Sequence, residues 1–273
     1  MTKPSTTPRP RVLVAVGPAT ADSRALAAAA QLAQTSGAEF AALFVEDINM
    51  LRLAELPFAF EVGLTSSTPR PLVAADIERT FRNQANQLRH ALSELASALQ
   101  FSFSFEIARG RPAHALLAAS AAQDLVVLSG NAARSFAHVS ALDVVREALR
   151  RPADRATTRK RPVVAVLQSP ATAPRVLAAA QLLASTVQTE LILLVGGEQG
   201  HAGLAKTIRD WLAARHLHAP ITLLPELDPE STAALLAEND PLALFWPGDG
   251  ESTIAPEIDA LLTALACPLL IVR

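Results

Sequence analysis

The sequence contains no tyrosine and only one cysteine, and aromatic residues make up 4% of its 273 positions. A single cysteine, Cys267, excludes an internal disulfide and a metal site built from several cysteines. The shortage of aromatic side chains and the abundance of Ala, Val and Leu allow helices to pack closely on a sheet, which favours an α/β protein over a β-sandwich. No apolar run approaches the roughly 20 residues that span a bilayer, and the first residues lack the apolar stretch of a signal peptide. We therefore expect a cytoplasmic protein without membrane association.

Basic residues are scarce in the C-terminal part of the chain. The formal net charge is −2, but residues 1–161 carry 19 Lys/Arg against 14 Asp/Glu, whereas residues 162–273 carry 5 against 12. Seven of the basic residues lie in 146–161, a stretch without apolar periodicity that is typical of a solvated linker. Nucleic-acid binding calls for a broader basic face with interleaved aromatic residues. We therefore expect no nucleic-acid partner.

Common catalytic motifs are absent as well. The sequence has no G-x-x-x-x-G-K-[ST], no H-E-x-x-H, no G-x-S-x-G and no G-x-G-x-x-G. His216 and His218 form the only close histidine pair, and their i,i+2 spacing at a helix end directs them to different sides, which argues against a metal site. The sequence thus predicts a protein that is not an enzyme and holds no metal.

What the sequence does contain is an internal repeat. Residues 23–43 overlay residues 174–194 at a constant offset of 151, with ten of 21 positions identical. Alanine abundance explains four of these matches but not pairs such as Thr35 with Thr186 or Glu39 with Glu190. Each segment lies between two apolar runs of strand length, so the repeated unit opens strand, helix, strand.

Alternating strands and helices predict parallel sheets with right-handed crossovers. The fold class is therefore α/β, with two tandem doubly wound parallel-sheet domains. The expected strands cover 11–16, 39–45, 101–107, 125–129, 162–166, 221–224, 242–245 and 268–272, together with the run LILLV. The expected helices cover 73–99, 112–122, 141–150, 230–237 and 258–266. One further helix starts near residue 22, and another lies around Leu204 to Leu212. The corresponding domains are a disordered N-terminus at 1–10, a first domain at 11–151, a basic linker at 152–161 and a second domain at 162–273.

One strand is missing from this scheme. The run 162–166 could end the first unit or begin the second, and its distance from the next helix favours the second. About nine main strands are expected, which leaves the first sheet one strand short or completed in another way.

The order of elements, together with three motifs, resembles the universal stress protein family. The motifs are LFVED at 43–47, GRPAHALLAASAAQDLVVLS at 110–129 and CPLLIVR at 267–273. The resemblance covers nearly the whole chain and indicates a tandem-type member. It implies a stress-response role, often with a dimeric or pseudo-dimeric arrangement, and gives Asp124 a structural role.

In the ATP-binding branch of that family, strand one ends in an aspartate and strand four leads into a loop of pattern G-x2-G-x9-G-[ST]. Here strand one is followed by Gly17 in the first unit and by Leu167 in the second, so the expected carboxylate is absent twice. Glycines in such loops let backbone N–H groups approach phosphates. The resemblance therefore implies a nucleotide site whose key residues have changed.

The two phosphate loops also depart from the pattern. The first unit has no second glycine and a shorter run to the terminal serine, and the second unit has Asp249 and Glu251 where phosphates would lie. We expect neither ATP nor another cofactor to bind, with ATP or AMP binding through an altered loop kept as the alternative. The residues that would then contact the nucleotide are Gly17, Val45, Gly130, Asn131, Arg134, Ser140, Gly248, Gly250 and Ser252.

Two expectations concern partners. The apolar strand 268–272 would be an exposed sheet edge in an isolated domain, which predicts a homodimer or a compact pseudo-dimer. The insertion 47–72 is long and rich in apolar residues, which predicts a mobile or partner-facing lid over a cavity or an interface. The leading hypothesis is a non-enzymatic stress-response protein that acts by dimerisation or by binding an unidentified protein partner.

Overall fold

The computed structural model describes residues 10–17, 23–62, 68–99, 101–128, 161–196, 201–224, 229–248, 261–262, 265 and 267–273. Its first half contains β1 (Arg11–Val16), α1 (Ser23–Ser36), β2 (Glu39–Asp47), α2 (Ile48–Ala54), β3 (Phe60–Val62), β4 (Pro69–Pro71), α3 (Ala74–Leu99), β5 (Phe103–Gly110), α4 (Pro112–Ala119) and β6 (Leu125–Leu128). Its second half contains β7 (Val163–Leu167), α6 (Ala173–Val187), β8 (Leu191–Gly196), α7 (His201–Ala213), β9 (Ile221–Leu224), α8 (Pro229–Asn239), β10 (Ala243–Pro247) and β11 (Leu269–Val272).

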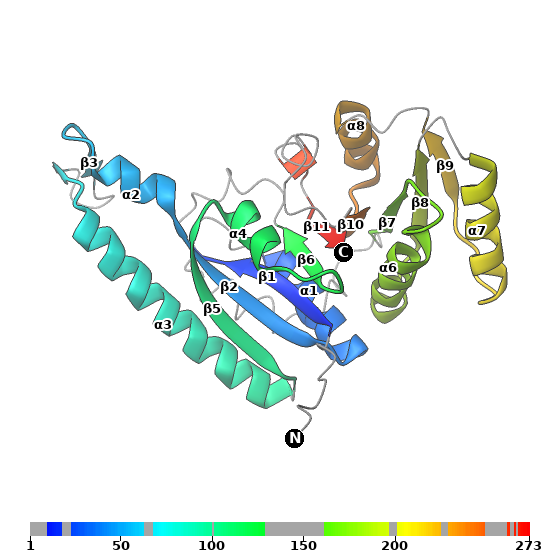
Figure 1. The fold of residues 1–273 in the computed structure, drawn as a ribbon, viewed down its shortest axis with the longest axis horizontal. Helices are drawn as coiled ribbons and strands as arrows, with labels where there is room; N and C mark the ends of the chain where they lie inside the picture. The colour runs from blue at the N-terminus through cyan, green and yellow to red at the C-terminus, as the bar shows by residue number, and fades with distance from the viewer. Residues whose placement is uncertain are drawn as a thin grey trace, which may run out of the picture.

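Nine strands form one continuous sheet in the order β5-β2-β1-β6-β11-β10-β7-β8-β9 (Figure 1). Every neighbouring pair is parallel except β6 and β11, which are antiparallel. The α/β class with parallel sheets is therefore confirmed, but the expectation of two separate sheets is corrected. The sheets of the two units are continuous because β11, which pairs with β10 on one side, pairs with β6 on the other. In this way β11 occupies the strand position that the first unit lacks.

The strand predicted at 162–166 belongs to the second half. The sequence alone did not decide between the two units. It forms β7, which pairs with β8 on one side and β10 on the other. Its five residues are all buried, as expected for a parallel strand covered on both faces.

Side chains alternate along the strands between two apolar layers. Val12, Val14 and Phe40 contribute to the layer under α1, α3, α6 and α7, whereas Leu13 and Ala41 face α4, α8 and Leu261. Helices thus cover both faces of the sheet (Figure 1). No helix among the described residues is long and apolar enough to cross a membrane.

Most element boundaries follow the sequence expectations closely. The helix expected at 73–99 is α3, and Gly37 ends α1 with φ of 66°, a left-handed conformation that glycine adopts without steric cost. The expected helix at 141–150, residues 152–160 of the expected basic linker and residues 1–9 of the expected disordered start at 1–10 lie outside the described residues. Cys267 is buried, as a small core residue should be.

The C-terminal strand corrects the reasoning behind the expected homodimer. β11 lies in the interior of the sheet, with β6 on one side and β10 on the other, so it presents no free edge. The homodimer and the compact pseudo-dimer both remain predictions, but a homodimer cannot depend on this strand.

The insertion 47–72 forms α2 and the two-stranded ribbon of β3 and β4. Asp47 caps α2, since its Oδ1 accepts a hydrogen bond of 2.9 Å from the Asn49 N–H. Leu51 is buried, but Met50, Phe58 and Phe60 are exposed, so these side chains do not cover a cavity as a closed lid would.

Candidate functional site

The antiparallel joint between β6 and β11 decides where a site of the predicted kind can lie. In parallel sheets ligands bind beyond the carboxyl ends of the strands. Because Val272 at the end of β11 pairs with Leu125 at the start of β6, the carboxyl ends of the two halves lie at opposite edges of the sheet. The two predicted nucleotide sites therefore cannot merge into one.

The structure describes three of the nine predicted nucleotide contacts. Gly17 follows β1 and Val45 lies on the neighbouring β2; both are buried at the carboxyl edge of the first half. Gly248 follows β10 at the opposite edge, so the structure does not bring it together with the other two. The remaining residues lie outside the described part of the chain, namely Gly130, Asn131, Arg134, Ser140, Gly250 and Ser252.

Beside Gly17 and Val45, the charges at the first carboxyl edge are paired with one another. Arg109 on β5 contacts Glu46 on β2 at 2.9 Å and Glu78 on α3 at 3.1 Å. Arg109 Nε donates a hydrogen bond to Glu46 Oε2 at 3.0 Å, and this bond raises the pKa of Arg109 above its ordinary value. This guanidinium therefore ties two strands to α3, and the two carboxylates already compensate the positive charge that a phosphate would need.

A second charged cluster lies at the opposite edge of the sheet, where the two halves are joined. Sequence reasoning largely missed this cluster. Asp124, 1% exposed, accepts hydrogen bonds from Arg11 Nη2 at 2.6 Å and from the Ala121 N–H at 2.8 Å. Arg11 Nη2 also donates to the Ala119 carbonyl at 3.1 Å. The hydrogen bond with Asp124 raises the pKa of Arg11 above its ordinary value. The burial of Asp124 and its contacts within the first half are consistent with the structural role expected of this aspartate.

Two arginines from the second half reach the same segment. Arg273 Nη1 donates to the Leu117 carbonyl at 2.9 Å, and Arg175 Nη2 donates to the Ala122 carbonyl at 2.7 Å. The carbonyls at a helix C-terminus carry partial negative charge, which favours nearby cations. The guanidinium groups are thus engaged at the end of α4 and in the turn after it. Only proximity in the fold reveals this, because Arg273 lies 156 residues from Leu117.

The geometry of the sheet can be compared with that of solved proteins. A universal stress protein from Archaeoglobus fulgidus DSM 4304 superposes with a TM-score of 0.54 at 11% sequence identity, covering 96% of this chain and 98% of that one. The chain has the universal stress protein fold. A functionally unknown protein, PA1789 from Pseudomonas aeruginosa PAO1, gives a TM-score of 0.50 at 11% identity over 97% of this chain and 92% of its own. No protein-family model and no curated protein sequence matches the chain.

Within this universal stress protein fold, Gly248 has a packing role. Its N–H donates to the Val272 carbonyl at 2.9 Å, so this donor is used to hold β11. A Cβ atom at this position would lie 2.8 Å from Ile271 Cγ2 and 3.2 Å from Arg273 Cγ. The glycine is therefore explained by the close approach of β11, without a ligand.

This packing predicts the effect of Gly248→Ala. The added methyl group must push β11 or its side chains away, and we expect the free energy of unfolding to fall by about 1–3 kcal/mol. Chemical denaturation measures the change, with Gly203→Ala in α7 as control, since a Cβ there would meet only Pro170 Cγ at 3.9 Å. Equal stability of the two variants would contradict a packing role for Gly248.

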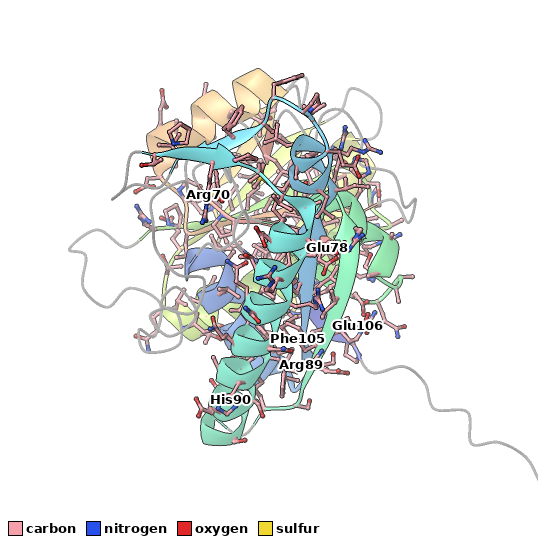
Figure 2. All side chains as sticks on the ribbon, turned by 90° about the vertical axis from the view of Figure 1, so that its left-hand side faces the viewer. Arg70, Glu78, Arg89, His90, Phe105 and Glu106 are labelled. Atoms are coloured by element: carbon pink, nitrogen blue, oxygen red, sulfur yellow. The ribbon has the colours of Figure 1, made fainter. Side chains whose placement is uncertain are left out.

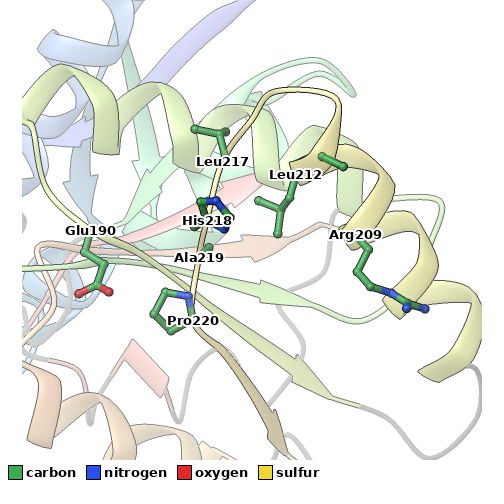
Figure 3. A pocket seen from close by; sticks show the side chains of 8 residues that line it. Glu190, Arg209, Leu212, Leu217, His218, Ala219 and Pro220 are labelled. Carbon is green, nitrogen blue, oxygen red and sulfur yellow. The ribbon is translucent and has the colours of Figure 1, made fainter.

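A separate pocket lies at the other end of the second half's strands. It has a volume of about 640 Å³ and lies where α7 ends and β9 begins (Figure 3). Glu190 and Arg209 lie at opposite ends of the row of labelled side chains, and His218 lies between them (Figure 3). No predicted nucleotide contact lines this pocket. Among the described residues, no group of three or more His, Cys, Asp or Glu could hold a metal ion.

Proposed function

We propose that this protein is a non-enzymatic stress-response protein of the universal stress type, which acts in the cytoplasm by dimerisation or by binding a protein partner, without nucleic acid or a bound cofactor. The observation that carries the proposal is the state of Gly248, whose N–H and Cβ space are both taken by β11. A glycine in this condition cannot serve a phosphate.

The chemistry of both edges supports the loss of nucleotide binding. A triphosphate needs several convergent N–H donors or cations to replace its hydration. At the first edge, Arg109 is already engaged by Glu46 and Glu78. At the second edge, Arg273 donates to carbonyls of the first half, and the sequence continues after Gly248 with an aspartate.

The arrangement of the halves supports the proposal that the chain is a tandem repeat and a pseudo-dimer. Apart from β11, which has no counterpart among the described strands of the first half, the strand order outward from the centre matches in the two halves, and α1 contacts α6. Thr35 Oγ1 and Thr186 Oγ1, which occupy equivalent positions in the sequence repeat, lie 3.4 Å apart. Equivalent residues meet each other where two copies are related by a two-fold axis.

The alternative is a nucleotide-binding protein that uses an altered loop in the first unit. It is favoured there because Gly17 directly follows β1 and Val45 lies on the neighbouring β2, at one carboxyl edge. In the second unit, the N–H of Gly248 is not available for such a role.

Calorimetric titration with ATP, AMP and cyclic nucleotides distinguishes the two functions. We expect no dissociation constant tighter than about 10 µM, since such affinity corresponds to roughly 7 kcal/mol and would need a complete phosphate loop. Tighter binding that Gly130→Asp abolishes and Gly250→Asp preserves would establish the alternative, with the site in the first unit. Release of phosphate from ATP in the same samples would overturn the non-enzymatic assignment.

A further inference from the structure

The ribbon formed by β3 and β4 has one hydrogen-bonding edge that is open and one that is blocked. The Leu72 N–H donates to the Ala59 carbonyl at 2.9 Å, and the ribbon pairs Glu61 with Arg70. In an antiparallel ladder, hydrogen-bonded pairs alternate with pairs whose N–H and C=O groups point outward. The pair Glu61 and Arg70 is therefore hydrogen-bonded, and the residues on either side of each point their backbone groups away from the ribbon.

On β4 the outward-pointing residues are Pro69 and Pro71, which have no N–H to donate. On β3 they are Phe60 and Val62, whose N–H and C=O groups face away from β4. Among the described residues β3 has no other neighbouring strand. Proline is a common means of blocking a sheet edge, so β4 is protected while β3 is available for pairing.

The same segment carries most of the exposed large hydrophobic side chains among the described residues. Of their ten exposed large hydrophobic side chains, seven lie between positions 50 and 73, including Phe58 (71% exposed), Phe60 (58%) and Val62 (60%). Figure 1 shows α2 and β3 projecting at one end of the molecule, away from the nine-stranded sheet. Clustered exposed apolar groups of this kind mark an interaction site.

We propose that the open edge of β3 pairs with the β3 strand of a second copy of this chain. This inference rests on the dimerisation proposed above and names its surface. An antiparallel pairing about a two-fold axis sets Phe60 opposite the partner's Val62 and Val62 opposite the partner's Phe60. Aromatic and β-branched side chains form favourable cross-strand pairs, and each copy contributes two N–H donors and two carbonyl acceptors.

Charge is consistent with self-pairing. Residues 48–73 carry two arginines and two glutamates, so the segment has no net charge to attract nucleic acid or an anionic membrane. Glu61 lies opposite the partner's Glu61 at the centre of the pairing, which costs repulsion. In each copy, however, an ion pair between Arg70 Nε and Glu61 Oε1 compensates the carboxylate. Figure 2 shows Arg70 on the ribbon, well separated from the other labelled side chains.

The blocked edge limits the assembly to two copies. Pairing through β3 creates a four-stranded sheet whose outermost strands are both β4. Because Pro69 and Pro71 remove the outward donors there, no third copy can add in the same way. The result is a closed, symmetric dimer.

The first test removes the outward N–H of β3. Val62→Pro leaves the ladder with β4 intact because this N–H faces away from it, and Val62→Thr is the matched control that keeps the donor. In sedimentation equilibrium of the full chain, Val62→Pro should raise the dimer dissociation constant at least about tenfold, whereas Val62→Thr should stay close to the unchanged protein. Equal association of the two variants would overturn the pairing.

The second test uses the central charges. Arg70→Gln leaves two uncompensated glutamates facing each other and should weaken the dimer about tenfold, with a smaller effect in 1 M salt because the Debye length falls to about 3 Å. Adding Glu61→Gln should restore association, although the ion pair within the ribbon is lost. Absence of this rescue would show that Glu61 does not meet its copy.

The two proposals can fail separately. A chain that stays monomeric at its highest soluble concentration would overturn both the proposed dimerisation and the β3 pairing. A dimer that Val62→Pro leaves unchanged would keep the dimerisation and overturn only its placement at β3.

Discussion

Replacing Ile271 by proline is expected to unfold the protein. The Arg273 N–H donates to the Asp124 carbonyl at 3.3 Å, and the alternation of the antiparallel ladder then directs the Ile271 N–H toward Val126 on β6. Proline has no N–H and is excluded from central strands. It leaves the Val126 carbonyl without its partner in the core, and the ring cannot fit between two neighbouring strands.

The expected loss approaches the whole stability of the domain. One unsatisfied buried group costs about 1–3 kcal/mol, and the broken ladder and displaced side chains add to it, against a total of about 5–15 kcal/mol for a typical protein. Far-ultraviolet circular dichroism and limited proteolysis measure the outcome. Ile271→Val is the control, since it keeps the N–H and should cost only about 0.5–1.5 kcal/mol. A folded Ile271→Pro variant with an altered oligomeric state would show that β11 is a peripheral strand after all.

The sequence predicted the local elements well because their signals are local. A continuous apolar run such as that of β7 indicates a parallel strand covered on both faces, and the apolar spacing from Ile77 to Leu99 indicates the long helix α3. The end of α1 at Gly37 is equally local, since a left-handed glycine at a helix C-terminus depends only on the residues around it.

Strand pairing between distant parts of the chain could not be predicted in the same way. Nothing in residues 268–272 specifies whether the second edge of this strand meets another molecule or β6 of its own chain. A sheet edge can be completed by either, and the choice depends on where the two halves lie relative to each other. The number of predicted strands left the first sheet one strand short, and in the structure β11 takes this position.

In the candidate site, too, features that depend on neighbouring residues were predictable, whereas features that depend on contacts between distant residues were not. The absence of a strand-one carboxylate is readable from Gly17 and Leu167 alone. The role of Gly248 is not, because glycine suits both a phosphate loop and a close packing contact. Only the position of Ile271 against it distinguishes them. The arginines that join the halves were missed since surface and buried arginines look alike in a sequence.

Replacing Asp124 by asparagine is expected to destabilise severely the packing of β1 against the turn that follows α4. Both carboxylate oxygens accept hydrogen bonds: Oδ1 from Arg11 Nε at 3.3 Å, and Oδ2 from Arg11 Nη2 and the Ala121 N–H. An asparagine must turn its NH2 group toward one of these donors, whichever way the amide is oriented. The change also leaves the guanidinium of Arg11, whose side chain is only 25% exposed, without its counter-ion.

Removing one partner of a buried ion pair costs about 3–5 kcal/mol, and the partial exposure of Arg11 reduces this to about 2–4 kcal/mol. For a protein of this size, that corresponds to a fall in Tm of very roughly 4–16 °C. Scanning calorimetry measures it. Asp76→Asn is the matched control, because its ion pair with Arg79 is exposed on both sides and should be worth less than about 1 kcal/mol. If Asp124→Asn melted at the same temperature as Asp76→Asn, the buried ion pair between Asp124 and Arg11 would contribute no more than an exposed one. In the expected case, Arg11→Met combined with Asp124→Leu should recover part of the loss, since the uncompensated charge is then gone and both sites are apolar.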